Sequence, residues 1–399
     1  MKSTDIDVKK DYEAVAKCPH SEFCGGCSSD GIPYSQQLSV KQEQVDELIS
    51  LKRLHIDNQD EIQAAPEQFR YRNKMEYTFG DMEKGGPMTL GMHVKGKFMS
   101  IVTVDSCRLV HEDFNIILKA VLDWTVQKGY TAYHKKSHKG LMRHLVLRRG
   151  IATGEILVNI VTSDEEGFDE EGFVELINGL KLENIIEGVL RTVNSAKADA
   201  VKCDELRILY GSPYYTEEIM GLKFKVSAFS FFQTNVKAAE RLYMEALNLI
   251  DNLEGKTVFD LFCGTGTITQ AAALKAKKAV GVEIVEEAVK AAKENAMING
   301  ISNCEFIAGD VFEVLDSYSQ KPDVIIVDPP RAGISAKALD KILSYGVDQI
   351  VYISCNPRTM VENLYYLQYN GYRIRYLKPF DNFPNTKHTE CICLLERNK

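Results

Sequence analysis

Residues 257–269 read TVFDLFCGTGTIT, an apolar run that leads directly into a glycine-rich turn. Four more apolar runs follow it, namely AVGVEIV, CEFIAGD, DVIIVDPP and IVYISCNP, and helix-like stretches such as EEAVKAAKENAMING separate them. Strands that helices cover on both faces lose the alternation of polar and apolar residues. The pattern therefore predicts a doubly wound α/β domain over about residues 228–399.

The chain before residue 228 follows a different pattern. Short alternating runs such as MEYTFG, HLVLRR and EILVNIV, separated by glycine-rich turns and one or two helices, predict a mixed α+β domain over about 66–227. Upstream of it we expect an amphipathic helix over about 34–54, with Leu51 among its packing residues. Because 399 residues suffice for two or three domains, we expect one region over 1–227 and a second over 228–399.

The composition is that of a soluble protein, with 45% hydrophobic and 26% charged residues. No run of about 18 apolar residues is available to cross a membrane. The first fifteen residues lack the apolar segment of a secretory signal, so we expect a cytoplasmic protein. The net charge of −8 argues mildly against a nucleic-acid partner unless basic residues cluster locally.

Two stretches supply such clusters. Residues 133–149 hold six lysines and arginines and three histidines without an acidic residue, and residues 69–77 alternate basic with aromatic side chains. Taken alone, a basic run is more often a solvated loop, and the alternation also suits a half-buried strand. Both stretches are nevertheless candidates for binding an RNA backbone.

Polar residues mark the ends of four successive predicted strands. Asp260 precedes the glycine turn, and Glu283, Asp310 and Asp328 end the next three strands. Any one of them could be a helix cap or a surface residue, but ligands of such sheets bind at the carboxyl ends of the strands. A nicotinamide-dependent oxidoreductase could use the turn with Glu283, but the third glycine of a dinucleotide motif is missing. Together the set resembles the class I S-adenosylmethionine-dependent methyltransferases.

The fifth predicted strand ends at Cys355, directly before Asn356-Pro357, where we expect a helix to begin. Most single cysteines are structural, yet a thiol near a helix N-terminus can have a lowered pKa. A thiolate that adds to carbon 6 of uracil makes carbon 5 nucleophilic, and a base must later remove the carbon 5 proton. Glu390 in the sequence KHTE is the candidate base, and His388 competes with it.

These motifs, together with a cysteine cluster that begins at Cys18, resemble the RNA uridine-5-methyltransferase family, which modifies ribosomal RNA and tRNA. The resemblance implies S-adenosylmethionine as methyl donor, Cys355 as nucleophile, Glu390 as general base, and a target base extruded from its stack. Phe262 stands where the family often has Tyr. The implied cofactor-binding residues are Gln233, Phe262, Thr267, Glu283, Asp310 and Asp328.

The N-terminal cysteines form a compact triplet, Cys18, Cys24 and Cys27, and Cys107 is the next along the chain. In a chain without export signals they indicate metal binding or catalysis rather than disulfides. Four thiolates suit either structural zinc or an iron–sulfur cluster, and spacing does not choose between them. The resemblance implies a four-iron four-sulfur (4Fe-4S) cluster. With seventeen residues before Cys18 we expect no N-terminal RNA-binding β-barrel (TRAM domain), which leaves RNA binding to the basic stretches.

The resemblance to members with the cysteine cluster implies 23S ribosomal RNA as the first expected substrate, with no membrane and no obligate protein partner. A tRNA substrate is the alternative. A non-catalytic iron–sulfur RNA-binding protein is a third reading, which the joint presence of Cys355 and Glu390 disfavours.

Overall fold

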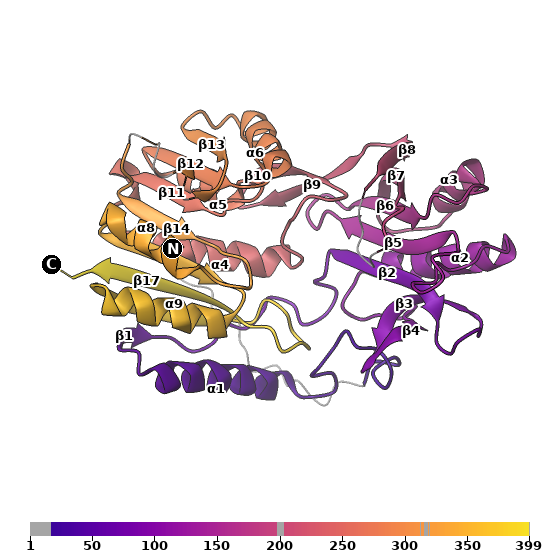
Figure 1. Cartoon of the computed structure of the whole chain (residues 1–399), viewed down its shortest axis with the longest axis horizontal. Helices are drawn as coiled ribbons and strands as arrows, with labels where there is room; N and C mark the ends of the chain where they lie inside the picture. Colours follow the sequence, from indigo (N-terminus) through magenta and orange to yellow (C-terminus); the bar gives the residue numbers. More distant parts are fainter. Residues whose placement is uncertain (1–16, 198–202, 312, 315–317, 319, 399) are drawn as a thin grey trace.

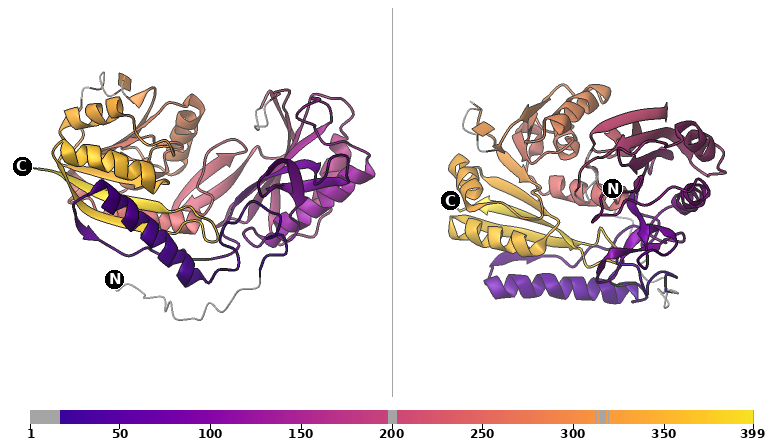
Figure 2. Two further views of the ribbon diagram at one scale, coloured as in Figure 1. Left: turned by 60° about the horizontal axis from the view of Figure 1, so that its bottom comes forward. Right: turned by 45° about the vertical axis from the view of Figure 1, so that its right-hand side comes forward.

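The computed structural model describes residues 17–197, 203–311, 313–314, 318 and 320–398. Within these residues, two large β-sheets form two bodies that stand side by side (Figures 1 and 2). A two-stranded ribbon of β9 (Tyr214–Ile219) and β10 (Leu222–Ser227) lies between the two sheets in the sequence. None of the helices described is long and apolar enough to cross a bilayer.

The C-terminal sheet has the strand order β1-β16-β17-β15-β14-β11-β12-β13 in the described part of the chain. Every neighbouring pair is parallel except the two that involve β17, which runs antiparallel to β15 and β16. The α/β fold predicted from the five apolar runs is confirmed. The strands are β1 (Ile56–Gln59), β11 (Thr257–Leu261), β12 (Lys278–Glu283), β13 (Cys304–Ala308), β14 (Val324–Val327), β15 (Gln349–Ser354), β16 (Tyr372–Phe380) and β17 (Glu390–Arg397).

Helices cover both faces of this sheet, which explains why its strands lack polar alternation. Successive strand residues point to opposite faces: Val258 and Val351 pack with α4 and α5, whereas Phe259 and Ile350 pack with α1, α8 and α9. A proline at the first turn and a capping asparagine start α9. The helices are α1 (Tyr34–Lys52), α4 (Val236–Asn248), α5 (Thr267–Ala273), α6 (Glu286–Ile298), α8 (Ala336–Tyr345) and α9 (Pro357–Tyr369), with a 3₁₀ turn η1 (Leu253–Gly255).

The second sheet has the order β4-β3-β2-β5-β6-β7-β8 among the described residues. Its pairs are antiparallel except β6 and β7, which are parallel and joined through α3. Apolar residues of α2 and α3, including Phe114, Trp124 and Phe173, cover one face. The elements are β2 (Lys74–Asp81), β3 (Met88–Val94), β4 (Lys97–Thr103), α2 (Glu112–Gln127), β5 (Met142–Arg149), β6 (Glu155–Thr162), α3 (Glu170–Asn178), β7 (Ile185–Val193) and β8 (Glu205–Gly211).

Two early elements join the C-terminal sheet rather than the second sheet. Strand β1 pairs in parallel with β16, and α1 lies against α9 (Figure 2). The helix predicted over 34–54 is present as α1, but its packing was predicted wrongly at Leu51, which is 70% exposed. The side chains that α1 buries include the polar Gln37 and Lys41. The division of the chain at residue 228 remains a prediction, and α1 and β1 lie before it.

Candidate active site

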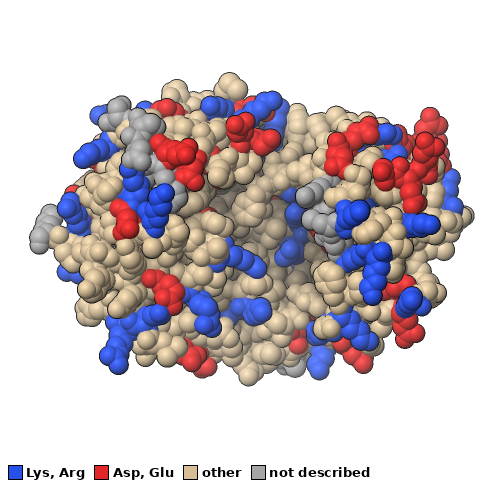
Figure 3. All heavy atoms as spheres, in the orientation of Figure 1, with Lys and Arg blue, Asp and Glu red and all other residues tan. Residues whose placement is uncertain are grey.

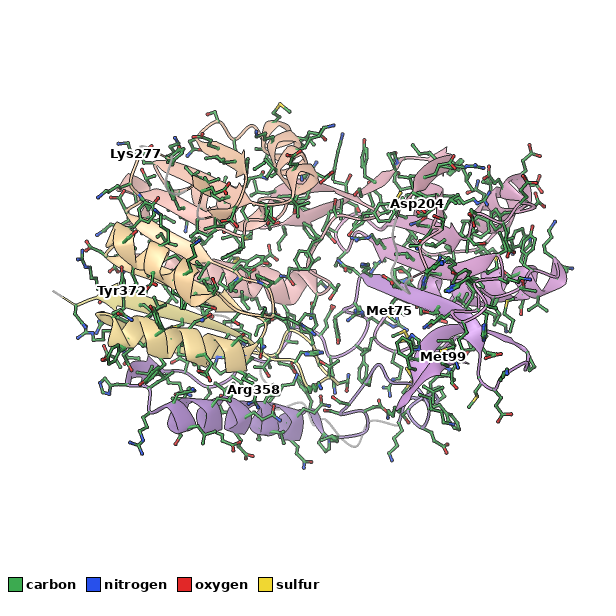
Figure 4. All side chains as sticks on the ribbon, viewed as in Figure 1. Met75, Met99, Asp204, Lys277, Arg358 and Tyr372 are labelled. Atoms are coloured by element: carbon green, nitrogen blue, oxygen red, sulfur yellow. The ribbon has the colours of Figure 1, made fainter. Side chains whose placement is uncertain are left out.

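The carboxyl ends of the central strands meet at one edge of the C-terminal sheet. Figure 4 shows Lys277 and Tyr372, at the starts of β12 and β16, on the outer side, and Arg358, just after β15, on the side toward the second sheet. The candidate residues therefore lie on the side of the sheet where the two bodies face each other. Figure 3 shows a hollow between them with basic side chains at its rim.

The strand register places Cys355 opposite Glu390. Ser354 of β15 pairs with Cys391 of β17, so the next antiparallel step brings Cys355 and Glu390 together. On the other side of β15, Val327 pairs with Tyr352 in parallel, which places Asp328 at the same edge. A thiol and two carboxyl groups from three neighbouring strands thus occupy one site.

These three groups disfavour each other's negative charge. Burial raises the pKa of Glu390 to about 8, and the nearby Asp328 contributes to that rise. Burial also raises the pKa of Asp328 to about 7. The pKa of Cys355 rises to about 11 through burial and the charges of Glu390 and Asp328, while a hydrogen bond from Arg331 opposes the rise. The site therefore favours protonated forms, and Arg331 is the cation that favours the thiolate.

The turn after Cys355 is tied to the Asp-Pro-Pro-Arg segment. Asn356 donates from Nδ2 to the carbonyl of Arg331 at 2.9 Å, and its Oδ1 accepts from the backbone N–H of Arg358 at 3.3 Å, which caps α9. The helix expected after Cys355 is α9. No role for Arg331 was predicted, because a basic residue in a loop gives no sign of which thiol it faces.

The glycine turn between β11 and α5 has the geometry of a ligand cradle. Phe262, which directly follows β11, has a positive φ of 71°, a conformation that non-glycine residues rarely adopt outside functional sites. Gly264 has a φ of +53°, and a Cβ at this position would meet nothing within 4 Å, so its backbone borders open space. Gly266 is packed tightly: a Cβ there would lie 2.6 Å from the ring of Phe306.

Glu283, Asp310 and Thr267 surround this turn. Glu283 accepts hydrogen bonds from the backbone N–H groups of Gly264 and Val285, each at 3.0 Å. The Glu283 carbonyl accepts from the N–H of Gly309 at 2.9 Å, which places Asp310 beside it. Thr267 is the first residue of α5. These predicted cofactor residues lie around one turn.

Gln233 and Tyr243 lie near the reacting groups. Gln233 donates from Nε2 to the hydroxyl of Tyr243 at 2.9 Å, and Tyr243 lies near Asp328 and Glu390, whose charges help raise its pKa. Asp260 is buried and accepts a hydrogen bond from the Thr269 hydroxyl at 2.6 Å, so it ties the end of β11 to α5. Tyr243 was not predicted, since within α4 it follows the ordinary apolar periodicity of a packed helix.

His388 packs within the loop before β17 and borders a different cavity. Its ring packs edge to face against Phe383, with ring centroids 6.3 Å apart, and it lines a cavity shared with the N-terminal cysteines. Burial and nearby cations lower the pKa of His388. The charge of Glu390 acts on the thiol of Cys355, and the strand register places the two residues opposite each other. The geometry favours Glu390 over His388 as a partner of Cys355.

The cavity that His388 lines has a volume of about 230 Å³ and lies where the two bodies meet. It brings together side chains from the N-terminal loop, from β2, from residues 107–109 and from the loop before β17. Burial raises the pKa of Cys107 to about 11 and that of Cys27 to about 12, and charges on the other cysteines add to both. All four cysteines, Cys18, Cys24, Cys27 and Cys107, line this cavity as free thiols.

Among the residues that the structure describes, no group of three or more His, Cys, Asp or Glu side chains is arranged to hold a metal ion. A single zinc ion needs its thiolates at about 2.3 Å from one point. The four thiols line the cavity without forming such a group among the described residues, so the structure shows neither the zinc site nor the predicted 4Fe-4S cluster.

Two arginines of the basic stretch 133–149 are unavailable to RNA. Arg143 is 2% exposed and donates to the carbonyls of Asn194 and Ala196, each at 2.7 Å. Arg148 is 3% exposed and donates to the carbonyl of Ser230 at 2.7 Å. The prediction that these residues bind RNA is wrong, because their guanidinium groups satisfy buried backbone carbonyls. Exposed basic residues remain at Arg70, Lys136 and Lys139.

Comparisons with known proteins place the chain among RNA methyltransferases. Residues 216–398 match the family model described as tRNA (Uracil-5-)-methyltransferase. An uncharacterized RNA methyltransferase of Clostridium tetani is 46% identical over 396 residues, which cover 98% of this chain and 86% of that relative. One from Clostridium acetobutylicum is 46% identical over 384 residues, covering 96% of this chain and 84% of the relative.

Among solved structures, the Pyrococcus abyssi tRNA (uracil-54, C5)-methyltransferase in complex with S-adenosyl-L-homocysteine is similar, with a TM-score of 0.77. The two sequences are 24% identical, and the match covers 93% of this chain and 86% of the other. At this identity the likeness shows a shared fold.

Proposed function

Because this chain belongs to the RNA uracil-5-methyltransferase family, we propose that it transfers a methyl group from S-adenosylmethionine to carbon 5 of a uridine in RNA. Cys355 is the covalent nucleophile and Glu390 is the general base. The observation that carries the proposal is the placement of Cys355 opposite Glu390, beside Asp328, where β15, β17 and β14 end or begin. A structural cysteine would need no such neighbours.

The chemistry follows from these side chains. S-adenosylmethionine, when bound, supplies an electrophilic methyl group. The Cys355 thiolate forms a bond to carbon 6 of the uracil, and the electrons of the 5,6 double bond make carbon 5 nucleophilic. After methyl transfer, the Glu390 carboxylate takes the proton from carbon 5. The 5,6 double bond re-forms as the bond from carbon 6 to Sγ breaks, which frees Cys355.

Arg331 and Asp328 assist the addition of the Cys355 thiolate to the uracil. The thiolate, rather than the thiol, is the nucleophile, and the raised pKa of Cys355 makes it scarce near neutral pH. Arg331 donates a hydrogen bond to Cys355 and so stabilises its charged form. Asp328, which is half-buried and has a raised pKa, can act while protonated as a hydrogen-bond donor to the uracil.

The open space at Gly264 and the carboxylate of Glu283 fit S-adenosylmethionine. A ribose can donate its hydroxyls to Glu283, and backbone at a glycine turn lets a ligand approach closely. Gln233, whose amide contacts Tyr243 beside the reacting groups, lies toward the methyl-transfer end. The proposed cofactor residues are Gln233, Phe262, Thr267, Glu283, Asp310 and Asp328.

The four N-terminal cysteines are proposed to hold a 4Fe-4S cluster. Such a cluster carries a separate iron for each thiolate, which suits four thiols spread around a cavity of about 230 Å³ better than one shared ion does. Cys27 and Cys107 have raised pKa values, and a cationic group that binds them would stabilise their thiolate forms. The cluster would link the N-terminal loop to the second sheet.

Anaerobic purification tests this assignment. The wild-type chain is expected to contain about four irons and four sulfides per polypeptide, and Cys107→Ser is expected to lose most of both. Cys203→Ser is the matched control, because Cys203 is exposed and lies outside the cavity. Stoichiometric zinc without sulfide, or equal iron loss from both variants, would contradict the assignment.

The first candidate substrate is 23S ribosomal RNA, because the four-cysteine motif resembles members of the family that act there. A tRNA substrate is the second candidate, favoured by the family model, whose description names tRNA, and by the similar P. abyssi structure, whose printed target is uracil 54 of tRNA. The exposed Arg70, Lys136 and Lys139 are available to bind phosphates of either RNA.

A covalent trap tests the function. The protein is incubated with S-adenosylmethionine and 5-fluorouridine-containing 23S rRNA or tRNA, and the products are separated on a denaturing gel. Fluorine on carbon 5 cannot leave as a proton, so we expect a stable adduct on one of the two RNAs, and peptide mapping should place it at Cys355. Methylation without an adduct on either RNA would refute the covalent mechanism, and an adduct only on tRNA would exclude the ribosomal substrate.

A further inference from the structure

The loop between β16 and β17, residues 381–389, leads directly to Glu390 and is buried over much of its length. Asp381 is 1% exposed, Asn385 is 2% exposed and Thr389 is 4% exposed. We refer to residues 381–389 as the base loop. Because Glu390 is the next residue, any shift of this loop moves the proposed base relative to Cys355.

Helix α1 holds the first part of the base loop through a buried ion pair. Lys41 Nζ lies 2.6 Å from Asp381 Oδ1, and the two side chains are 3% and 0% exposed. Lys41 Nζ also donates to the carbonyl of Phe383 at 3.2 Å, and the N–H of Phe383 donates to Asp381 Oδ1 at 3.1 Å. One lysine therefore contacts both the side chain and the backbone of the loop.

One turn earlier on the same face of α1, Gln37 holds the centre of the base loop. Its Nε2 donates to Asn385 Oδ1 at 3.2 Å, and its Oε1 accepts from the N–H of Asn385 at 2.8 Å. Asn385 has a positive φ of 66°, which costs energy in a non-glycine residue and needs contacts to maintain it. The reciprocal pair of hydrogen bonds supplies such contacts.

The same loop is tied to the cysteine segment. The N–H groups of Ser28 and Ser29, which follow Cys27 directly, both donate to the carbonyl of Asn385 at 3.1 Å. The Tyr71 hydroxyl donates to the carbonyl of Pro384 at 2.9 Å. The base loop is thus fixed from several sides, but only α1 contributes a charged side chain to these contacts among the described residues.

Stability alone does not explain the ion pair. Burial raises the pKa of Asp381 and lowers that of Lys41, which means that desolvation outweighs their mutual attraction. A well-packed apolar pair is often at least as stabilising as a buried ion pair, whereas charged partners enforce one geometry. This ion pair, whose charged forms burial disfavours, anchors the base loop that leads to Glu390.

We propose that Gln37 and Lys41 of α1 are positioning residues for the reaction: they hold the base loop in the one arrangement that places Glu390 against the carbon 5 proton. The inference rests on the proposed function, because it assumes that Glu390 is the base. Neither residue touches the reacting groups. Their effect is therefore confined to the step in which Glu390 takes the proton.

The test compares Lys41→Met with Lys52→Met. Lys52 lies on the same helix and also bridges to the C-terminal body, with Nζ 2.6 Å from Glu362 Oε2, but both side chains are well exposed. Each variant is incubated with 23S rRNA and tRNA transcripts and with S-adenosylmethionine that carries a labelled methyl group. The measured quantities are kcat, KM for RNA, and labelled protein–RNA adduct on denaturing gels.

For Lys41→Met we expect kcat to fall by roughly 100-fold with KM nearly unchanged, because misplacing a catalytic group by about 1 Å has an effect of that size. Labelled adduct should accumulate, since methyl transfer still occurs while proton removal is slow. Lys52→Met should match the wild type. Gln37→Leu, which leaves no buried charge, should show the same accumulation to a smaller extent.

A Lys41→Met/Asp381→Asn double variant separates loss of positioning from the destabilising effect of an unpaired buried carboxylate, because it removes both charges of the pair. If it folds with a wild-type Tm, it should still accumulate labelled adduct. Folded Lys41 and Gln37 variants without adduct would overturn the positioning role, provided that Glu390→Gln accumulates it. If Glu390→Gln also fails to accumulate adduct, the assignment of the base itself is wrong and the positioning proposal fails with it.

Discussion

Methylation of RNA is expected to fall by roughly 10⁴-fold or more when Cys355 is replaced with alanine, as it does for enzymes that lose their nucleophile. Without the bond from Sγ to carbon 6, carbon 5 of the uracil does not become nucleophilic enough to attack a methyl group. Cofactor binding should persist, because the glycine turn and Glu283 lie on other strands. Transfer of labelled methyl groups to RNA and calorimetric titration with S-adenosylmethionine measure the two quantities.

Cys304→Ala is the matched control for this variant. Cys304 is also half-buried, but it begins β13 and its Sγ contacts only the carbonyl of Ile301, at 3.9 Å, among the described hydrogen bonds. Methylation by Cys304→Ala should stay near the wild-type rate. A Cys355→Ala enzyme that retained more than a tenth of the activity would show that methyl transfer proceeds without a thiol adduct.

The strand ends could be predicted because they depend on local information. Apolar runs without alternation indicate buried parallel strands, and the carboxyl ends of such strands form one edge. That reasoning was enough to bring Asp328 and Cys355 to the same edge. It was not enough for the antiparallel pairing of Ser354 with Cys391, because a helix, a strand and the base loop separate the two residues. The resemblance to a family, rather than the pattern, singled out Glu390.

The role of α1 could not be predicted, because periodicity shows that a helix has a buried face but not what covers it. Lys41 was not among the residues singled out in this helix, and its partner Asp381 is 340 positions away. Leu51 looked like a packing residue, yet it lies at the last turn, beyond the contact with α9 that buries Val45. In both cases the surroundings of the side chain depend on tertiary contacts that the helical periodicity does not contain.

The prediction that Arg143 and Arg148 of the basic stretch 133–149 bind RNA was wrong for a similar reason. Its second half forms β5, which is the middle strand of a sheet and is buried on both faces. A charged side chain on a central strand needs hydrogen-bond acceptors, and the carbonyls of Asn194 and Ser230 accept from Arg143 and Arg148. The sequence revealed the charge but not the position of the strand in the sheet.

Replacing Glu390 with glutamine is expected to leave methyl transfer intact and to stop the enzyme after it. The amide keeps the size of the carboxyl group but cannot accept the carbon 5 proton, and general-base catalysis contributes about 10²- to 10⁴-fold. Turnover should fall by that factor, and a protein–RNA adduct that carries the transferred methyl group should survive on a denaturing gel. Wild-type protein should show almost none with unmodified RNA.

The pH dependence provides a second measure of the same residue. Only the carboxylate form of Glu390 can accept a proton, and burial raises its pKa to about 8. The rate at which a preformed methylated adduct releases product should therefore increase as the pH rises from 6 through about 8. In Glu390→Gln the adduct should persist across this range, because no group at this position titrates.

His388→Gln distinguishes the two candidate bases. The pKa of His388 is lowered, so its ring is neutral near pH 7 and chemically able to take a proton. His388 lines the cysteine cavity and packs on Phe383, whereas the strand register places Glu390 opposite Cys355, so this variant should release product without adduct. Adduct from His388→Gln together with normal release by Glu390→Gln would transfer the role to the histidine. The opposite pattern would tie proton removal to the residue that β17 places opposite Cys355.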